Sequence, residues 1–217
     1  MNRSRHRTSK GTAPLTGVVA AGLCLLYIAI VWAGVPTEQL RTSVDQVIVI
    51  LQDPSLKAES KVPERRAAVR KEADNIFDFE ETAKRALGPH WQKLTEPQRR
   101  EFVSLFTDLL ERAYLSKIDQ YSGEKLTYVG DTVDGDLAIV RTRFVTKNGT
   151  EVPVEYRMVR RGDRWLVYDV VIEGISLVNN YRSQFNKIIQ TSSYDELVSR
   201  MKTSQFSAPG SAKSPRS

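Results

Sequence analysis

The spacing of apolar residues changes near Ser122-Gly123, and this change limits the folds that the 217-residue chain can adopt. Before it, apolar residues recur every three or four positions, as on one face of a helix. After it, apolar and polar residues alternate over residues 125–133, 137–146, 150–161 and 165–173, as in half-buried strands. Helices followed by consecutive strands predict an α+β domain rather than a sheet wound with alternating helices.

Short turn-forming pairs separate the four predicted strands: Asp134-Gly135, Asn148-Gly149 and Gly162-Asp163. Turns this short join neighbouring antiparallel strands. In the third strand Val154 points to one face and Glu155 to the other, and the alternation continues along the strand. We therefore expect a curved four-stranded antiparallel sheet whose apolar face is covered by helices.

Six helices are expected around this sheet. Asp78 and Glu81, like Thr95 and Gln98, have the spacing of a capping box, which marks the start of a helix. Apolar stripes at helical spacing predict helices over residues 36–52, 63–76, 79–87, 95–121, 176–190 and 194–202.

The last predicted strand is apolar on both faces. Alternation places Leu166, Tyr168, Val170 and Ile172 on one face, and Trp165, Val167, Asp169 and Val171 on the other. Such a strand needs cover on both sides. We expect helices on one side and an aromatic-bearing segment on the other.

The chain divides into three parts. Residues 1–35 combine a basic start with an uncharged apolar run, which is typical of an export signal, with cleavage expected after Ala33. The run also approaches the roughly 20 residues that cross a bilayer, so an uncleaved inner-membrane anchor over residues 17–35 is the alternative. Either one places the α+β domain, residues 36–203, in the periplasm. Residues 204–217 form a polar low-complexity tail that we expect to be disordered.

The net charge of +6 does not indicate nucleic-acid binding. Four basic residues, Arg3, Arg5, Arg7 and Lys10, lie in the first ten positions, and no acid precedes Glu38. Without them the net charge falls to +2. The exported part therefore has no basic run of the kind that a nucleic acid needs, and we expect no nucleic-acid partner.

Residues for metal or cofactor chemistry are scarce. The one cysteine, Cys24, lies in the apolar run, and neither histidine, His6 or His90, has neighbouring ligands in the sequence. A zinc site needs three or four clustered donors, so no metal is expected. The sequence also has no glycine-rich phosphate-binding loop, so no nucleotide cofactor is expected. This composition favours binding over catalysis.

Asp169 is the acidic residue with the strongest case for a catalytic role. In an apolar strand its carboxylate could act as a general base. The simpler role is structural, with backbone N–H groups or an arginine such as Arg182 satisfying the charge. Proton abstraction would also need an oxyanion stabiliser, for which Tyr156 or Tyr168 could serve. An isomerase-like pocket enzyme with Asp169 as its base is thus the alternative to a binding protein.

The strand-to-helix junction carries a spaced set of motifs. They read WLVYDV at residues 165–170, EGISL at 173–177 and YRSQF at 181–185, and LTEPQRREF stands upstream at 94–102. Together these stretches resemble the signature of the MlaC family, the periplasmic phospholipid-binding proteins also known as toluene-tolerance auxiliary components of a lipid ABC transporter. The resemblance covers about residues 37–202.

The resemblance implies a hydrophobic pocket for acyl chains, enclosed by helices and the curved sheet, without cofactor or catalysis. It also implies that the protein shuttles phospholipid between an outer-membrane lipoprotein complex and an inner-membrane lipid ABC transporter complex. A related branch of the family is associated with hopanoids, so a polycyclic lipid is the alternative cargo.

We expect apolar side chains of the sheet and of two helices to line this pocket. The expected lipid-binding residues are Leu105, Leu109, Tyr114, Val140, Phe144, Val154, Tyr156, Met158, Leu166, Tyr168, Val170, Ile172, Tyr181 and Phe185.

Overall fold

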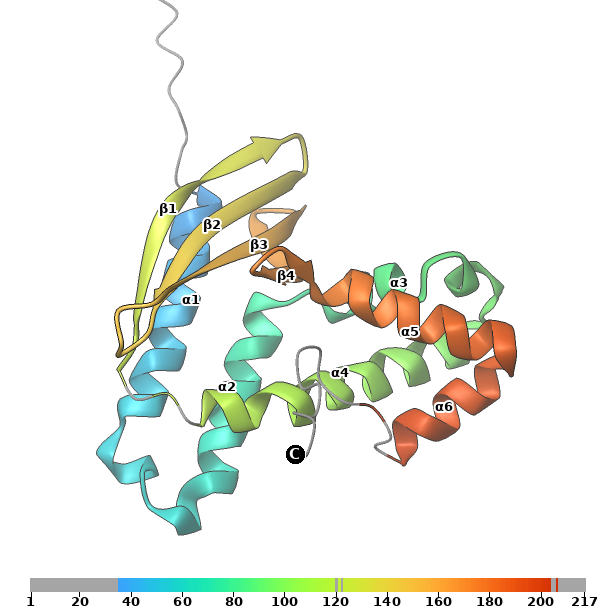
Figure 1. Ribbon diagram of the computed structural model, residues 1–217, viewed down its shortest axis with the longest axis horizontal. Helices are drawn as coiled ribbons and strands as arrows, with labels where there is room; N and C mark the ends of the chain where they lie inside the picture. The colour runs from blue at the N-terminus through green and yellow to red at the C-terminus, as the bar shows by residue number, and fades with distance from the viewer. Residues whose placement is uncertain (1–34, 120, 122, 204–205, 207–217) are drawn as a thin grey trace, which may run out of the picture. The chain divides into compact units, whose positions relative to one another are not determined.

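The computed structural model describes the protein over residues 35–119, 121, 123–203 and 206 (Figure 1). The expected export segment and the expected polar tail lie outside these residues, apart from Val35 and Phe206. No helix of the described part is both long and apolar enough to cross a bilayer.

Helices and strands are segregated along the chain, which confirms the predicted α+β fold class. The helices are α1 (Val35–Gln52), α2 (Val62–Ile76), α3 (Phe79–Leu87), α4 (Glu96–Ile118), α5 (Leu177–Thr191) and α6 (Tyr194–Lys202), with short 3₁₀ turns at Pro54–Leu56, Glu59–Lys61 and Gly88–Lys93. The strands are β1 (Lys125–Asp134), β2 (Leu137–Val145), β3 (Glu151–Arg161), β4 (Arg164–Ile172) and β5 (Ile175–Ser176).

The strands form one antiparallel meander in the order β1-β2-β3-β4-β5. It has one strand more than expected, because the chain turns back at Glu173 and Gly174 and β5 pairs with the end of β4. Glu173 has φ 50° and Gly174 has φ 81°, as in the tight turns that join hairpin strands. The side chain of Ser176 then caps α5 by accepting a hydrogen bond from Asn179 N.

A β-bulge at Tyr168 changes which side chains of β4 share a face. Arg157 of β3 pairs with Asp169, but the next residue, Met158, pairs with Val167, so Tyr168 has no partner in the register. Val167 therefore joins Met158 on the apolar face, contrary to the expectation from simple alternation. An extra residue shifts the period-two pattern by one position, which exchanges the faces beyond it.

Aromatic side chains fill the core between α3, α4, α5 and α6. Phe106 packs edge-on against Tyr181 and Phe185, with ring centroids 5.2 and 5.3 Å apart. Phe102 meets Phe185 in the same manner at 5.7 Å. Such edge-to-face pairs add stability beyond the apolar area that they bury. All four rings are almost completely buried in this helical core.

A second core lies between the sheet and α1, which contacts β1, β2 and β4 (Figure 1). Leu40 of α1 and Ile76 of α2 pack there against Val140, Met158 and Val167 of the sheet. This cluster occupies only one end of the apolar face. The rest of that face is left for the cavity described next.

Candidate functional site

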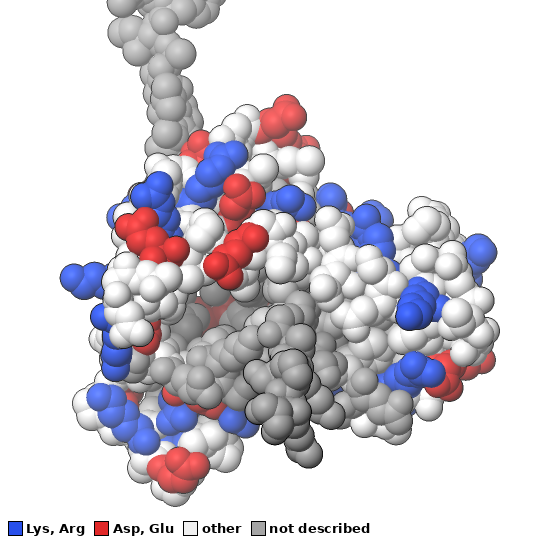
Figure 2. All heavy atoms as spheres, viewed as in Figure 1, with Lys and Arg blue, Asp and Glu red and all other residues white. Residues whose placement is uncertain are grey.

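A large apolar cavity lies between the apolar face of the sheet and helices α1, α2 and α4. Its volume is about 710 Å³, which falls within the roughly 300–1,000 Å³ of small-molecule sites. Figure 2 shows this face of the molecule hollowed below the strands. The lining residues are Val44, Val47, Ile48, Leu51, Val69, Arg70, Ala73, Phe77, Phe79, Thr82, Phe106, Thr107, Leu110, Glu111, Tyr114, Ile118, Tyr121, Glu124, Leu126, Phe144, Thr146, Val152, Val154, Tyr156, Tyr168, Asp169, Val170, Ile172, Leu177 and Val178.

Strand alternation and register build the sheet wall of the cavity. Val152, Val154 and Tyr156 are two residues apart along β3 and therefore share one face. Across the sheet, Val154 stands opposite Ile172 and Tyr156 opposite Val170. The side chains thus form adjacent rows, and the wall is continuous and apolar.

Helix α1 supplies the facing wall. Val44, Val47, Ile48 and Leu51 recur at spacings of three and four residues, which brings them to one side of the helix. All four line the cavity although none is fully buried. Because they line an apolar space, a hydrophobic ligand there would bury them further.

Half of the expected lipid-binding residues lie at this cavity. They come from α4 and from three strands, and they are Tyr114, Phe144, Val154, Tyr156, Tyr168, Val170 and Ile172. The structure brings these side chains together although they span almost sixty positions of the sequence.

Six of the other seven belong to the two cores. Leu105, Leu109, Tyr181 and Phe185 pack in the helical core, and Val140 and Met158 pack in the core below α1. Leu166 pairs with Val159 on the far side of the bulge and is not among the lining residues. Helix α4 contributes to both regions. One side of it packs against α5 and α6 in the helical core, while Leu110 and Tyr114 line the cavity.

Several lining residues were not expected from the sequence. The main examples are Val44, Val47, Ile48 and Leu51 of α1 and Val69 of α2. The apolar stripe of α1 is visible in the sequence, but it gives no indication that this helix lies across the sheet. Such a pairing of distant elements depends on the whole fold.

The hydrogen bonds of Asp169 indicate a structural role for this carboxylate rather than a role as a general base. Its side chain is only 2% exposed. One oxygen accepts hydrogen bonds from Ser176 Oγ at 2.6 Å and from Arg157 Nη1 at 3.2 Å, and the other accepts from Val178 N at 3.0 Å. These donors tie β4 to β3 and to the start of α5, and they satisfy the buried charge. The expected arginine partner was Arg182, which instead donates to Arg85 O.

Tyrosine hydroxyls provide polar groups in and beside the apolar wall. Burial raises the pKa of Tyr156 to about 12, although a hydrogen bond with Thr142 opposes part of the rise. Burial also raises the pKa of Tyr181 to about 12, and its neighbour Tyr114 has a pKa raised by burial and by Tyr181. At neutral pH all three are uncharged, which keeps the region compatible with an apolar ligand.

We expect the Tyr156 hydroxyl of the folded protein to remain protonated above pH 10, where a tyrosine in an unfolded chain ionises. Since its folded pKa lies above the unfolded value, the stabilisation is complete below about pH 10 and is lost as the pH rises toward 12. Phenolate absorbance during a rapid pH titration measures this. Tyr156→Phe should remove phenolate signal that appears near pH 12, and removal of signal that appears near pH 10 would contradict the assignment.

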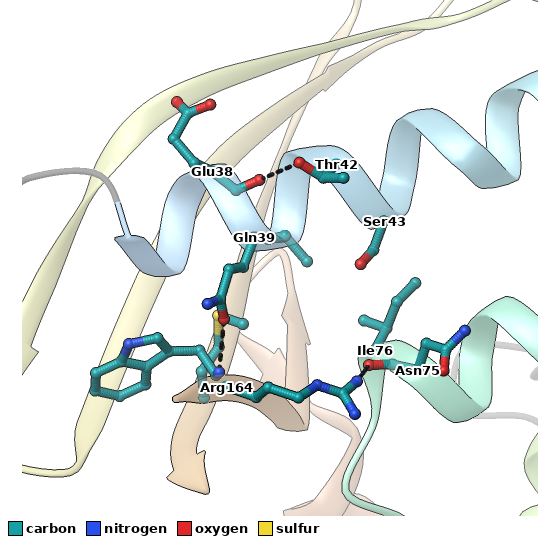
Figure 3. Close-up of a pocket in the computed structure, with 10 residues that line it drawn as sticks. Glu38, Gln39, Thr42, Ser43, Asn75, Ile76 and Arg164 are labelled. Carbon is teal, nitrogen blue, oxygen red and sulfur yellow. Dashed lines mark hydrogen bonds between the residues drawn. The ribbon is translucent and has the colours of Figure 1, made fainter. Parts of the chain in front are cut away.

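A smaller cavity of about 390 Å³ lies where the start of α1 meets the end of α2 and the start of β4 (Figure 3). The Gln39 amide accepts a hydrogen bond from Trp165 N at 2.7 Å and donates to Asp163 O at 3.0 Å. Arg164 donates to Asn75 O. These bonds join the three elements and cover the edge of β4. The larger cavity is therefore the better candidate for a ligand site.

Comparison with known proteins gives a consistent picture. A family model described as MlaC protein matches residues 41–203. The chain is 23% identical over 174 residues to the intermembrane phospholipid transport system binding protein MlaC of Haemophilus influenzae, covering 78% of this chain and 81% of that protein. It is 28% identical over 105 residues to the toluene tolerance protein ttg2D of Pseudomonas putida, covering 48% and 49% of the two chains.

The fold also matches a solved structure. This is the phospholipid-binding protein from Ralstonia solanacearum in complex with a phospholipid, with a TM-score of 0.68 and 26% sequence identity. The match covers 78% of this chain and 96% of that one. The arrangement of helices and open sheet is thus shared with a protein solved with a lipid bound.

Proposed function

Because this chain belongs to the MlaC family, we propose that it is a lipid carrier that holds phospholipid acyl chains in the 710 Å³ cavity. The observation that carries the proposal is the apolar wall of that cavity, built from the sheet on one side and α1, α2 and α4 on the other. A solved structure of the same fold, named as phospholipid-binding, supports the same ligand class.

Burial of methylene groups supplies the binding energy in this proposal. Each buried methylene contributes about 0.8 kcal/mol, so even part of one acyl chain would be held in water without a polar contact. The lining residues with residual exposure, such as Val47 and Ile48, would lose their remaining water at the same time. A ligand held mainly by nondirectional contacts can slide out along its tails, which suits transfer to an acceptor.

We place the carrier in the periplasm, where it moves phospholipid between an outer-membrane lipoprotein complex and an inner-membrane lipid ABC transporter complex. The name of the Haemophilus influenzae relative, a binding protein of an intermembrane phospholipid transport system, supports this placement. If residues 17–35 are not cleaved, they would anchor the same carrier to the inner membrane.

The chain is not an enzyme, since its family is one of lipid-binding transport proteins. The surroundings of Asp169 agree with this. Both carboxylate oxygens accept hydrogen bonds, from Ser176 and Val178 at the start of α5 and from Arg157 on β3. A general base would instead present an oxygen to substrate.

Native mass spectrometry of protein taken from the periplasmic fraction tests the proposal. We expect the protein to carry phospholipid, identified by solvent extraction, and its mature chain to begin after Ala33. A hopanoid in the extract would change the cargo but keep the carrier. Protein that purifies empty and takes up no phospholipid from vesicles would overturn the proposal, and an intact chain that stays with membranes would establish the tethered form.

A further inference from the structure

Arg70 of α2 is the only cation among the described residues that line the large cavity. Its side chain is 32% exposed, and that of its partner Glu111 on α4 is 30% exposed. Both side chains therefore reach from the cavity wall to solvent. This pair marks a point on the rim where the polar head of a lipid would emerge once its tails fill the apolar interior.

The guanidinium of Arg70 lies among acids at the edge of the cavity. Nη1 forms an ion pair with Glu111 and lies 3.8 Å from Asp108 Oδ1, while Nε lies 3.6 Å from Asp74 Oδ1. An arginine fork presents five N–H donors with the geometry that a phosphate accepts.

The charges around Arg70 also restrict the kind of headgroup that fits. Three acids, Asp74, Asp108 and Glu111, lie within ion-pair distance of this one cation. A phosphate without a counter-charge would approach Arg70 against the repulsion of these carboxylates. A phosphate followed by an ammonium group would meet complementary charge on both sides.

We propose that Arg70 and Glu111 form a headgroup site for a zwitterionic phospholipid, one that carries a phosphate diester and a primary ammonium. Arg70 donates hydrogen bonds to the phosphate, and Glu111, assisted by Asp108, accepts from the ammonium. Phosphatidylethanolamine has this chemistry, whereas phosphatidylglycerol has only the phosphate. The inference rests on the proposed function, because the tails must occupy the cavity for the head to reach its rim.

Arg66 provides a matched control on the same helix. It donates from Nε to Asp119 Oδ2 at 2.8 Å and so joins α2 to the residue that follows α4, much as Arg70 joins α2 to α4. It does not line the cavity. Replacement of Arg66 therefore removes a similar ion pair without touching the proposed site.

The test is lipid uptake by the full chain from vesicles of equal parts phosphatidylethanolamine and phosphatidylglycerol with identical acyl chains, with bound species counted by native mass spectrometry. We expect wild type and Arg66→Gln to prefer phosphatidylethanolamine. Arg70→Gln should lower the uptake of both lipids by about threefold to tenfold, as expected for the loss of a partly exposed charge-assisted hydrogen bond to the phosphate that both carry. The preference for phosphatidylethanolamine should persist, because the acids that attract its ammonium remain.

Glu111→Gln is the second variant and keeps the inference testable if Arg70→Gln does not fold. It removes the negative charge that attracts the ammonium and repels a phosphate without a counter-charge, so selectivity should shift toward phosphatidylglycerol. Equal uptake of the two lipids by wild type, unchanged selectivity in Glu111→Gln, or the same loss of uptake in Arg66→Gln as in Arg70→Gln would overturn the headgroup site. Wild type that takes up neither lipid would instead refute the carrier function itself.

Discussion

Val154→Glu is expected to give a folded protein that purifies without lipid, whereas wild type carries it. Val154 lines the cavity, is 9% exposed, and stands between Thr142 and Ile172 in the register. A glutamate there would place a carboxylate beside the acyl chains, which cannot solvate it. Lipid content by native mass spectrometry and folding by circular dichroism check the two halves of this expectation.

Val129→Glu is the matched control for this substitution. It makes the same change on β1 at a side chain that is 56% exposed and does not line the cavity, so lipid should be retained. If Val154→Glu does not fold, Val44→Glu on α1 introduces the charge from the facing wall at a half-buried position. Wild-type lipid content in a folded cavity variant would show that the acyl chains lie elsewhere.

Asp169→Asn is expected to lower the free energy of unfolding by about 2–4 kcal/mol without abolishing lipid binding. The amide offers one acceptor in place of two, so Ser176 Oγ or Val178 N loses its partner in a buried site. Arg157 also loses its counter-charge, although its side chain is 34% exposed and can turn to water. Urea unfolding should show a lower midpoint with an unchanged slope.

Glu155→Gln is the control for Asp169→Asn. Glu155 lies on the neighbouring strand β3 and pairs with Arg141 at 3.5 Å, where both side chains are exposed. Exposed pairs of this kind contribute about 0–1 kcal/mol, so the control should unfold almost as wild type does. Wild-type stability of Asp169→Asn together with loss of a measurable turnover would favour an isomerase-like enzyme over the carrier.

The two cores explain how such a fold can keep a cavity. Rings such as Phe106 and Phe185 fill the space between the helices, so that part of the molecule is stabilised without a ligand. The sheet is anchored to α1 at one end by Leu40. The remaining apolar face can stay partly unfilled because the rest of the molecule supplies the stability.

Local sequence patterns predicted the elements closely. The four main strands and the six helices lie within a few residues of their expected limits, since apolar period and turn residues such as Gly135 and Gly149 act over short distances. Alternation also placed Val154 and Tyr156 correctly on one face of β3. The two-residue strand β5 was not expected, because so short a segment has no period of its own.

Strand β4 shows most clearly what the local sequence pattern does not predict. The sequence alone determined that this strand is apolar on both sides, but the bulge at Tyr168 decided which side chains face the cavity. The bulge depends on pairing with β3, which residues within β4 do not encode.

The sequence by itself therefore determined the α+β class, the order of the elements and the apolar face of most of them, because these follow from local period and capping. Only the tertiary structure decided that α1 covers the sheet, that α4 divides its apolar residues between a packed core and a cavity, and that Arg70 meets Glu111 at the rim. These features arise from contacts between residues far apart in the chain, where each apolar face has several possible partners and the packing of the whole domain selects one.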